Sequence, residues 1–218
     1  MPSTAQQKEH IKPHNNRLYS KFIKRIIDLV VALLLIIVIS PLLLIISICI
    51  KLDSKGPVFY KQRRIGYQNK EFQIYKFRTM VDNAEKIGAG LRTSENDARI
   101  TKIGRILRIT SLDEVPQIIN IIRGEMSIIG PRPTVPQIIN KLEYGAQDRH
   151  LVLPGVTGLA QINGRQSIDW KEKINYDLKY VKRISFKLDL LIFFKTFLVV
   201  FKKESVHKKE ISKEFNDL

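Results

Sequence analysis

The most apolar part of the chain is a run of 22 residues, from Leu29 to Ile50, without a charged side chain. At about 1.5 Å per residue, a helix of this length spans roughly 33 Å, which is enough to cross a hydrocarbon core of about 30 Å. Ser40 and Pro41 stand in the middle of the run. A proline inside a helix removes a backbone hydrogen bond and clashes with the preceding turn. The pattern therefore predicts a membrane helix with a break at its centre.

Hydropathy alone favours a single-pass helix. The flanking charges favour a helix that enters the membrane and returns, because a spanning helix obeys the positive-inside rule only when one flank is poor in Lys and Arg. Basic residues stand on both sides of the run: Arg17, Lys21, Lys24, Arg25, Lys51, Lys55, Lys61, Arg63 and Arg64. We expect residues 21–51 to form a re-entrant helix-break-helix, in which the Ser40 hydroxyl bonds to the carbonyl of Ile37 that Pro41 leaves without a donor.

Beyond the apolar run, the pattern of hydrophobic positions changes to that of a folded domain. Residues 57–80 alternate in polarity, which predicts two strands joined by the turn GYQNKE. Residues 117–123 are apolar at helical spacing and end at Gly124, a common helix terminator. Residues 169–204 predict a helix, whose apolar part, 188–201, fits either the membrane interface or the core of the domain.

These elements predict an α+β fold. We expect a mostly helical cytoplasmic domain with a small antiparallel β-hairpin, anchored by the re-entrant membrane helix and by interfacial amphipathic helices. The chain then divides into a flexible polar tail (1–20), the membrane segment (21–51), the domain (52–204) and a charged tail (205–218).

Composition adds a strong positive charge to this picture. Lys and Arg total 37 against 21 acidic residues, a formal net charge of +16. This balance indicates an anionic partner, which could be nucleic acid, anionic lipid or a phosphorylated substrate. The single cysteine, Cys49, excludes an intramolecular disulfide. The sequence contains no Walker A pattern, no G-x-G-x-x-G and no Cys/His cluster suited to zinc.

Two adjacent carboxylates, Asp113 and Glu114, are the main candidates for chemistry. Ser111 and Glu114 have the spacing of a capping box, so Glu114 either caps the start of a helix or takes part in a reaction. Asp113 lies at a helix N-terminus in both interpretations, where the helix dipole favours the ionised form that a nucleophile or a metal ligand requires. Arg108 precedes the pair, and Arg132 stands between two prolines that restrict its backbone, as suits a bidentate phosphate contact.

Four segments of the chain together resemble the bacterial sugar transferase family, specifically its minimal monotopic phosphoglycosyl transferases. They are FYKQRRIG (59–66), FQIYKFRTM (72–80), RITKIGRILRITSLDEVPQIINIIRGEMSIIGPRP (99–133) and RHLVLPGVTGLAQINGR (149–165). The similarity runs from about Lys21 to about Lys203. One departure is Leu159, which stands where many relatives have tryptophan.

The resemblance implies that residues 52–204 form a catalytic domain. It would transfer a sugar-1-phosphate from a UDP-sugar to polyprenyl (undecaprenyl) phosphate, with Mg²⁺ as cofactor and UMP as the leaving group. By the same resemblance Asp113 is the nucleophile and Glu114 a Mg²⁺ ligand. Arg108 and Arg132 correspond to phosphate contacts. The reaction would be the first membrane step in the biosynthesis of a glycan such as a capsule, an exopolysaccharide, an O-antigen or a glycoprotein glycan.

The resemblance also concerns the membrane segment. Ser40 and Pro41 match the break of a re-entrant helix, and Lys24 and Arg25 match a basic pair at the membrane interface. The expected location is the bacterial plasma membrane, with the catalytic domain on its cytoplasmic face. Membrane lipid is then a partner and nucleic acid is not expected, while a homo-oligomer is left open. The competing hypothesis is a single-pass protein whose basic domain binds nucleic acid or anionic lipid.

A re-entrant segment keeps both of its ends in the cytoplasm. We therefore expect cysteines introduced near residues 15 and 60 to stay unlabelled by a membrane-impermeant maleimide added outside intact cells. Labelling of either position from outside would contradict the re-entrant topology.

Overall fold

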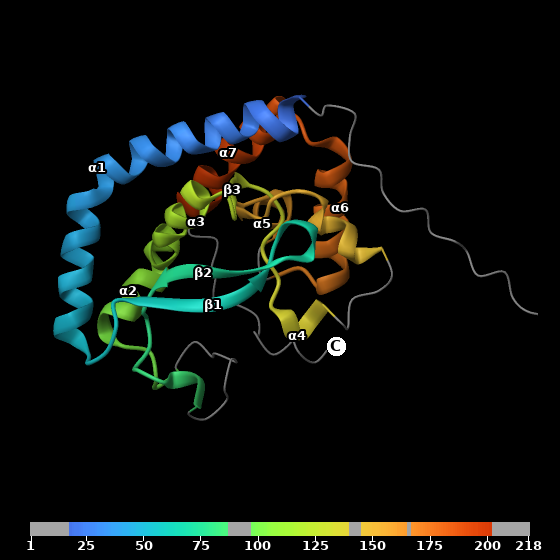
Figure 1. Ribbon diagram of the computed structural model, residues 1–218. Coiled ribbons are helices and arrows are strands. Elements are labelled where there is room, and N and C mark those ends of the chain that lie inside the picture. Colours follow the sequence, from blue (N-terminus) through green and yellow to red (C-terminus); the bar gives the residue numbers. More distant parts are fainter. Residues whose placement is uncertain (1–17, 87–96, 140–144, 165–166, 202–218) are drawn as a thin grey trace, which may run out of the picture.

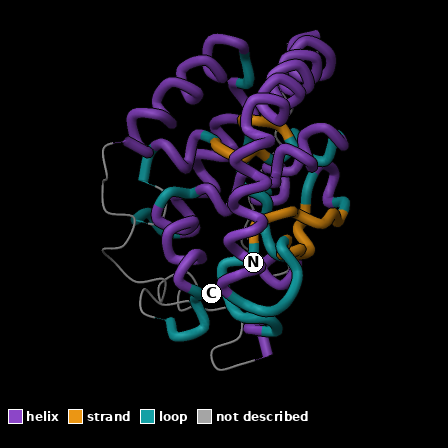
Figure 2. Tube along the Cα trace, turned by 90° about the vertical axis from the view of Figure 1, so that its left-hand side faces the viewer, coloured by secondary structure: helices purple, strands orange, loops and turns teal. Residues whose placement is uncertain are grey.

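A computed structural model of the chain describes residues 18–86, 97–139, 145–164 and 167–201. One long apolar helix, α1 (Lys24–Asp53), runs along a domain of shorter helices and two pairs of strands (Figure 1). Figure 2 shows that helices make up most of the described chain and that the strands form two small separate patches. The expected α+β architecture, mostly helical with a small antiparallel hairpin, is confirmed. The predicted tails 1–20 and 205–218 lie largely or wholly outside the described residues.

Helix α1 is continuous through Pro41, which lies inside it. Figure 1 shows the helix as two arms that meet at a bend near its middle. The Ser40 hydroxyl donates a hydrogen bond to the carbonyl of Ile37 at 2.9 Å, as the sequence predicted. The structure therefore has a bend within one helix where the sequence suggested a break between two helices, and the re-entrant topology stays a prediction. The segment Tyr19–Asp53 is long and apolar enough to cross a membrane.

The predicted hairpin is formed by β1 (Phe59–Ile65) and β2 (Glu71–Phe77), which pair antiparallel with Phe59 opposite Phe77. A second pair, β3 (Ser127–Ile129) and β4 (Gly155–Thr157), is parallel and was not predicted. A Cβ atom at Gly155 would lie 2.1 Å from the backbone nitrogen of Gly130, so glycine is needed where these two segments approach. This second pair brings together the Gly-Pro-Arg-Pro segment and the glycine-rich segment around Gly155.

The remaining helices are short, apart from the two at the C-terminal end. They are π-helix η1 (Tyr19–Ile23), 3₁₀ helices η2 (Tyr67–Asn69), η3 (Ala84–Lys86), η4 (Leu112–Gln117) and η5 (Ala146–Leu151), and α-helices α2 (Lys102–Ile109), α3 (Ile118–Arg123), α4 (Pro136–Ile139), α5 (Leu159–Ile162), α6 (Trp170–Arg183) and α7 (Phe186–Phe201). Helix α3 ends at Gly124 with φ 80°, as the sequence predicted. The single helix expected over 169–204 is in fact two, because the chain turns at Ile184, where ψ is 121°.

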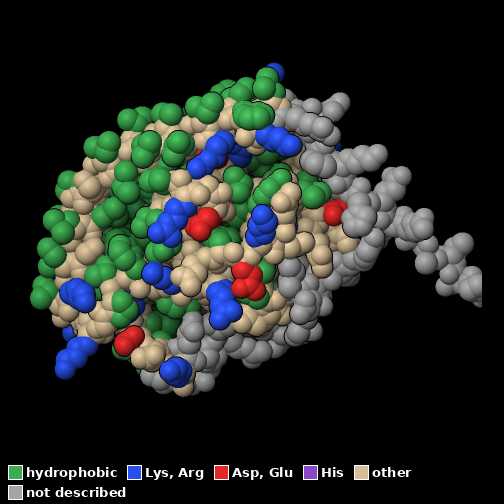
Figure 3. All heavy atoms as spheres, viewed as in Figure 1, with side chains coloured by type: hydrophobic (Ala, Val, Ile, Leu, Met, Phe, Trp, Pro, Cys, Tyr) green, Lys and Arg blue, Asp and Glu red, His purple; other side chains and the backbone are tan. Residues whose placement is uncertain are grey.

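Helix α7 has one face in the core and one face exposed. Ile192 is fully buried against Tyr180 and Val181 of α6 and Ile129 of β3. Six large apolar side chains of this helix are exposed: Phe186, Leu190, Leu191, Phe194, Phe197 and Leu198. Figure 3 shows a similar concentration of hydrophobic side chains along α1. The segment 188–201 therefore contributes to the core of the domain and also presents an apolar surface.

The bend in α1 gives a testable prediction. We expect Pro41→Ala to straighten the helix, because the substitution removes the ring clash and restores a donor for the Ile37 carbonyl. Spin labels at the exposed positions Val30 and Leu52 should then move apart, toward the roughly 33 Å that 22 residues of straight helix span. Ser47→Ala in the same helix is the control. An unchanged distance in Pro41→Ala would show that packing, not the proline, causes the bend.

Candidate active site at the acidic pair

The acidic pair lies in the first turn of η4, the short helix that follows α2. Between the two helices, Ser111 adopts a left-handed conformation with φ 58°, which reverses the chain. The side chain of Ser111 makes no capping hydrogen bond, so the capping-box interpretation of Glu114 is wrong. Helix η4 packs on strand β2, which places Asp113 and Glu114 next to Lys76 of the hairpin.

Glu114 joins three separate parts of the chain. Its Oε1 accepts a hydrogen bond from Lys76 Nζ of β2 at 2.7 Å and another from Arg132 Nη2 at 2.5 Å. Its Oε2 accepts a third from Arg132 Nη1 at 3.3 Å, which makes the arginine contact bidentate. The Glu114 side chain is 19% exposed and that of Lys76 is 17% exposed, so these charges are largely shielded from water.

The charges around Glu114 outweigh its burial. Burial alone raises the pKa of a carboxyl group, but the Arg132 guanidinium and the Lys76 ammonium together hold the pKa of Glu114 well below its ordinary value. Glu114 is therefore ionised throughout the physiological pH range.

Asp113 has the opposite environment. Burial raises the pKa of its carboxyl group, and the negative charge of Glu114 adds to the rise, while Lys76, Arg108 and Arg132 oppose it. The raised pKa corrects the expectation that the helix N-terminus would favour the ionised form, since burial dominates here. In the described part of the chain, no hydrogen bond holds the Asp113 carboxylate. Two adjacent carboxyl groups whose pKa values are pushed apart are typical of residues with different catalytic roles.

Arg108 precedes the acidic pair in the sequence and Arg132 follows it, and the charges of both act on Asp113. Arg108 Nε donates to the hydroxyl of Thr79 at 2.8 Å, and its positive charge lowers the pKa of Asp113. The structure thus brings together all four of the residues predicted for this site, together with Lys76. Sequence reasoning assigned no role to Lys76, which stands two positions after Ile74 in β2 and therefore on the same face of the strand. A lysine in a hairpin strand is more often exposed, and only the packing of η4 on β2 buries it.

Asp113 and Glu114 could bind a magnesium ion only if phosphate oxygens of a substrate supplied further ligands. The described residues contain no group of three or more Asp, Glu, His or Cys side chains arranged as metal ligands. Mg²⁺ in phosphate-transfer sites typically uses one or two carboxylates and completes its shell with phosphate oxygens and water. Asp113 offers oxygens without hydrogen bonds, whereas a metal at Glu114 would have to replace a contact with Lys76 or Arg132.

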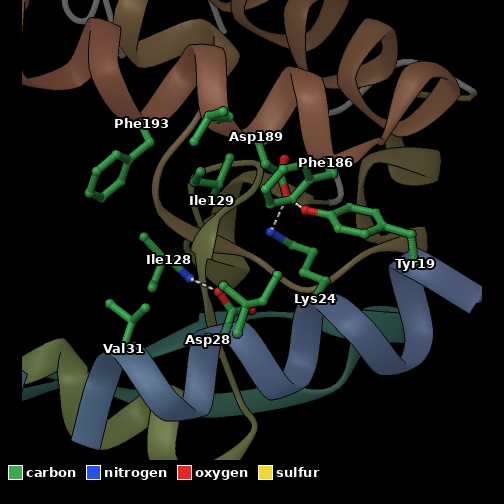
Figure 4. A pocket seen from close by; sticks show the side chains of 11 residues that line it. Tyr19, Lys24, Asp28, Val31, Ile128, Ile129, Phe186, Asp189 and Phe193 are labelled. Atoms are coloured by element: carbon green, nitrogen blue, oxygen red, sulfur yellow. Dashed lines mark hydrogen bonds and ion pairs between the residues drawn. The ribbon is translucent and has the colours of Figure 1, made fainter. Parts of the chain in front are cut away.

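The basic pair predicted for the membrane interface packs into the protein. Lys24 Nζ donates to Asp189 Oδ2 at 2.6 Å, and the Tyr19 hydroxyl donates to the same oxygen at 2.7 Å (Figure 4). Arg25 donates to the carbonyls of Ile121 and Ile122, at the end of α3. The hydrogen bonds of this pair therefore hold α1 against α7 and α3 rather than joining the acidic pair.

The lowered pKa of Glu114 makes the stability of the fold depend on pH. An acid whose pKa is lower in the folded state stabilises the fold above its unfolded-state pKa, about 4.3 for glutamate, and this stabilisation is lost as the pH falls toward the folded-state value. We expect Glu114→Gln to lower the Tm in detergent at pH 7, and the difference from the parent to shrink as the pH falls from about 5 to 3. Glu71→Gln is the control, because the Glu71 side chain is 53% exposed and lies 4.0 Å from Arg63. A difference that stays constant with pH would contradict this electrostatic role.

The chain is similar in sequence to several known proteins. The family model for bacterial sugar transferase matches residues 19–203. A UDP-glucose:undecaprenyl-phosphate glucose-1-phosphate transferase of Klebsiella pneumoniae is 45% identical over 189 residues, which cover 82% of this chain and 39% of that protein. A UDP-N-acetylgalactosamine-undecaprenyl-phosphate N-acetylgalactosaminephosphotransferase of Aeromonas hydrophila is 40% identical, over 80% of this chain and 43% of the other.

The matched region makes up a different fraction of the length of each relative. This chain spans about two fifths of the length of those two proteins. It spans more of the exopolysaccharide production protein ExoY of Sinorhizobium fredii, which is 38% identical over 79% of this chain and 83% of its own length. The family model covers most of the chain, including α1 and the acidic pair. The chain belongs to the bacterial sugar transferase family.

Proposed function

We propose that this chain transfers a sugar-1-phosphate from a UDP-sugar to undecaprenyl phosphate, at the cytoplasmic face of the bacterial plasma membrane. The observation that carries the proposal is the Asp113 carboxylate, which no hydrogen bond holds among the described residues and which lies within the field of Lys76, Arg108 and Arg132. Relatives named for this kind of transfer, with glucose or N-acetylgalactosamine as the sugar, support it.

In the proposed reaction the carboxylate of Asp113 attacks the phosphorus that bears the sugar. A bond forms between the aspartate oxygen and phosphorus, and the bond from phosphorus to the bridging oxygen breaks, so that UMP leaves with the electron pair. A phosphate oxygen of undecaprenyl phosphate then attacks the same phosphorus and releases the Asp113 carboxylate. Two displacements allow the soluble donor and the lipid acceptor to use one site in turn.

The surrounding charges suit such a reaction. Burial makes the Asp113 carboxylate more basic, and the three neighbouring cations limit the rise in its pKa. The Arg108 and Arg132 side chains would bind phosphate oxygens of the donor, since guanidinium groups match phosphate geometry. Glu114 would hold a Mg²⁺ ion, which would supply positive charge to offset that of the phosphates.

The apolar surfaces account for access to the lipid acceptor. Helices α1 and α7 expose large hydrophobic side chains, which is unusual for a protein surface facing water. In our proposal these surfaces lie in the membrane and its interface, so that the acidic pair can reach a lipid phosphate without the chain crossing the bilayer.

The role of Asp113 can be tested directly. We expect Asp113→Asn to lower UMP release from a UDP-sugar at least about a thousandfold, because the amide cannot act as the nucleophile. Incubation of the parent with the UDP-sugar alone should leave a phosphosugar adduct, detectable by mass spectrometry and absent from Asp113→Asn. Glu71→Gln is the matched control and should keep both activities.

The outcome separates the two functional hypotheses. Turnover retained in Asp113→Asn would remove Asp113 as the nucleophile. Salt-sensitive DNA binding by the parent, without UMP release from any of a panel of UDP-sugars, would support the basic binding module instead.

A further inference from the structure

Arg132 belongs to a segment, residues 131–134, in which each backbone carbonyl accepts a hydrogen bond from a different part of the fold. Its two ends are bound by backbone donors. The carbonyl of Pro131 accepts from Gly155 N at 2.9 Å, and the carbonyl of Thr134 accepts from Ile65 N at 2.8 Å. Strands β4 and β1 therefore fix the two ends of the segment.

The two inner carbonyls are held by arginine side chains. The carbonyl of Arg132 accepts from Arg149 Nη2 at 2.8 Å, and that of Pro133 accepts from Arg64 Nη1 at 3.1 Å. Prolines at 131 and 133 already restrict the neighbouring backbone. The bond from Arg149 fixes the orientation of the Arg132 peptide carbonyl, which the prolines leave partly free.

Arg149 lies at the junction of this segment with η5 and α6. It is 2% exposed, and its Nη1 donates to the Thr134 hydroxyl at 2.5 Å. Its Nη2 also donates to Asp177 Oδ2 of α6 at 2.5 Å, and its guanidinium lies 5.7 Å from the ring centre of Trp170. One buried guanidinium thus connects α6 to the Arg132 carbonyl and to the Thr134 side chain.

The Arg132 side chain is 48% exposed, yet it makes a bidentate contact with Glu114. An exposed arginine side chain loses much conformational entropy when it makes such a contact. A backbone that is already fixed reduces this loss, because only the side chain remains to be ordered. We propose that Arg149, held by Asp177, is a positioning residue that directs Arg132 onto Glu114 and so onto the donor diphosphate; the second half of this statement rests on the proposed function.

A purely structural role for the buried Arg149–Asp177 pair is the competing explanation. Lysine at position 149 would keep a positive charge beside Asp177 but has one nitrogen, which cannot reach all three acceptors in the arrangement of a guanidinium. The variant Arg149→Lys therefore separates charge balance from positioning. A positioning role changes how Arg132 and Glu114 interact, whereas a structural role lowers stability without changing that interaction.

The first experiment needs no enzymatic activity. The coupling between Arg132 and Glu114 is measured from the Tm values of Arg132→Ala, Glu114→Gln and the double variant in detergent, in the parent and again in Arg149→Lys. We expect a coupling of a few degrees in the parent and its loss in Arg149→Lys. A coupling of equal size in both backgrounds would overturn the proposal. Should Arg149→Lys fail to fold, Thr134→Val removes one of its contacts and should reduce the coupling in part.

The second experiment concerns catalysis. We expect Arg149→Lys to lower kcat/KM for the UDP-sugar by about tenfold to a hundredfold, and Arg132→Ala by about a hundredfold to a thousandfold. The double variant should lie close to Arg132→Ala, because Arg149 acts through Arg132. Asp189→Asn alters another buried ion pair, and whatever loss it causes should multiply with that of Arg132→Ala.

The two experiments separate the two proposals. Multiplied losses for Arg149→Lys and Arg132→Ala would overturn positioning while leaving the transferase function intact. Absence of UMP release from the parent would overturn the proposed function, and the Tm coupling would still decide the role of Arg149.

Discussion

The contact of Glu114 with Lys76 and Arg132 is the interaction on which the arrangement of the site depends. It joins strand β2, helix η4 and the segment after β3, three parts of the chain that are far apart in sequence. Glu114 is bound by two cations, whereas the neighbouring Asp113 has no hydrogen-bond partner in the described structure. The same cations act on both carboxyl groups, yet they lower the pKa of Glu114 below its ordinary value and only reduce the rise in that of Asp113. One cluster therefore holds a hydrogen-bonded carboxylate and a carboxylate without hydrogen bonds side by side.

Several basic residues of the described chain are used inside the protein. Buried or half-buried arginines donate to backbone carbonyls at points where helices end or segments cross: Arg25 at the end of α3, Arg78 at the end of α1 and Arg149 at the carbonyl of Arg132. Lys24 is likewise paired with Asp189 between α1 and α7. These four cations are occupied by contacts within the fold and are not available to an anionic partner. The argument for a phosphorylated substrate depends instead on the few cations gathered around Asp113.

Sequence patterns predicted the elements whose causes are local. Alternating polarity was sufficient for the β1–β2 hairpin, Gly124 for the end of α3, and the Ser-Pro pair for the bond from Ser40 to Ile37. Patterns failed where the cause is distant contact. Strands β3 and β4 have three residues each, which is too short to show the alternation of apolar and polar residues that marks a strand. They also pair across more than twenty positions of the sequence. The division of residues 169–204 into α6 and α7 depends on Ile184 being buried in the core beneath both helices.

By itself the sequence determined the apolar helix, the acidic pair, the arginines of the motifs and membership of the family, because each of these is carried by residue type and spacing within a short segment. Only the tertiary structure decided which charges meet. Lys76 reaches Glu114 because η4 packs on β2, and Arg149 reaches the Arg132 carbonyl because η5 and α6 pack behind the segment. The energy of a charge depends on its burial and on its partners within a few ångströms. Burial and partners are properties of the folded chain. The sequence therefore identified the candidate residues but not their electrostatic roles.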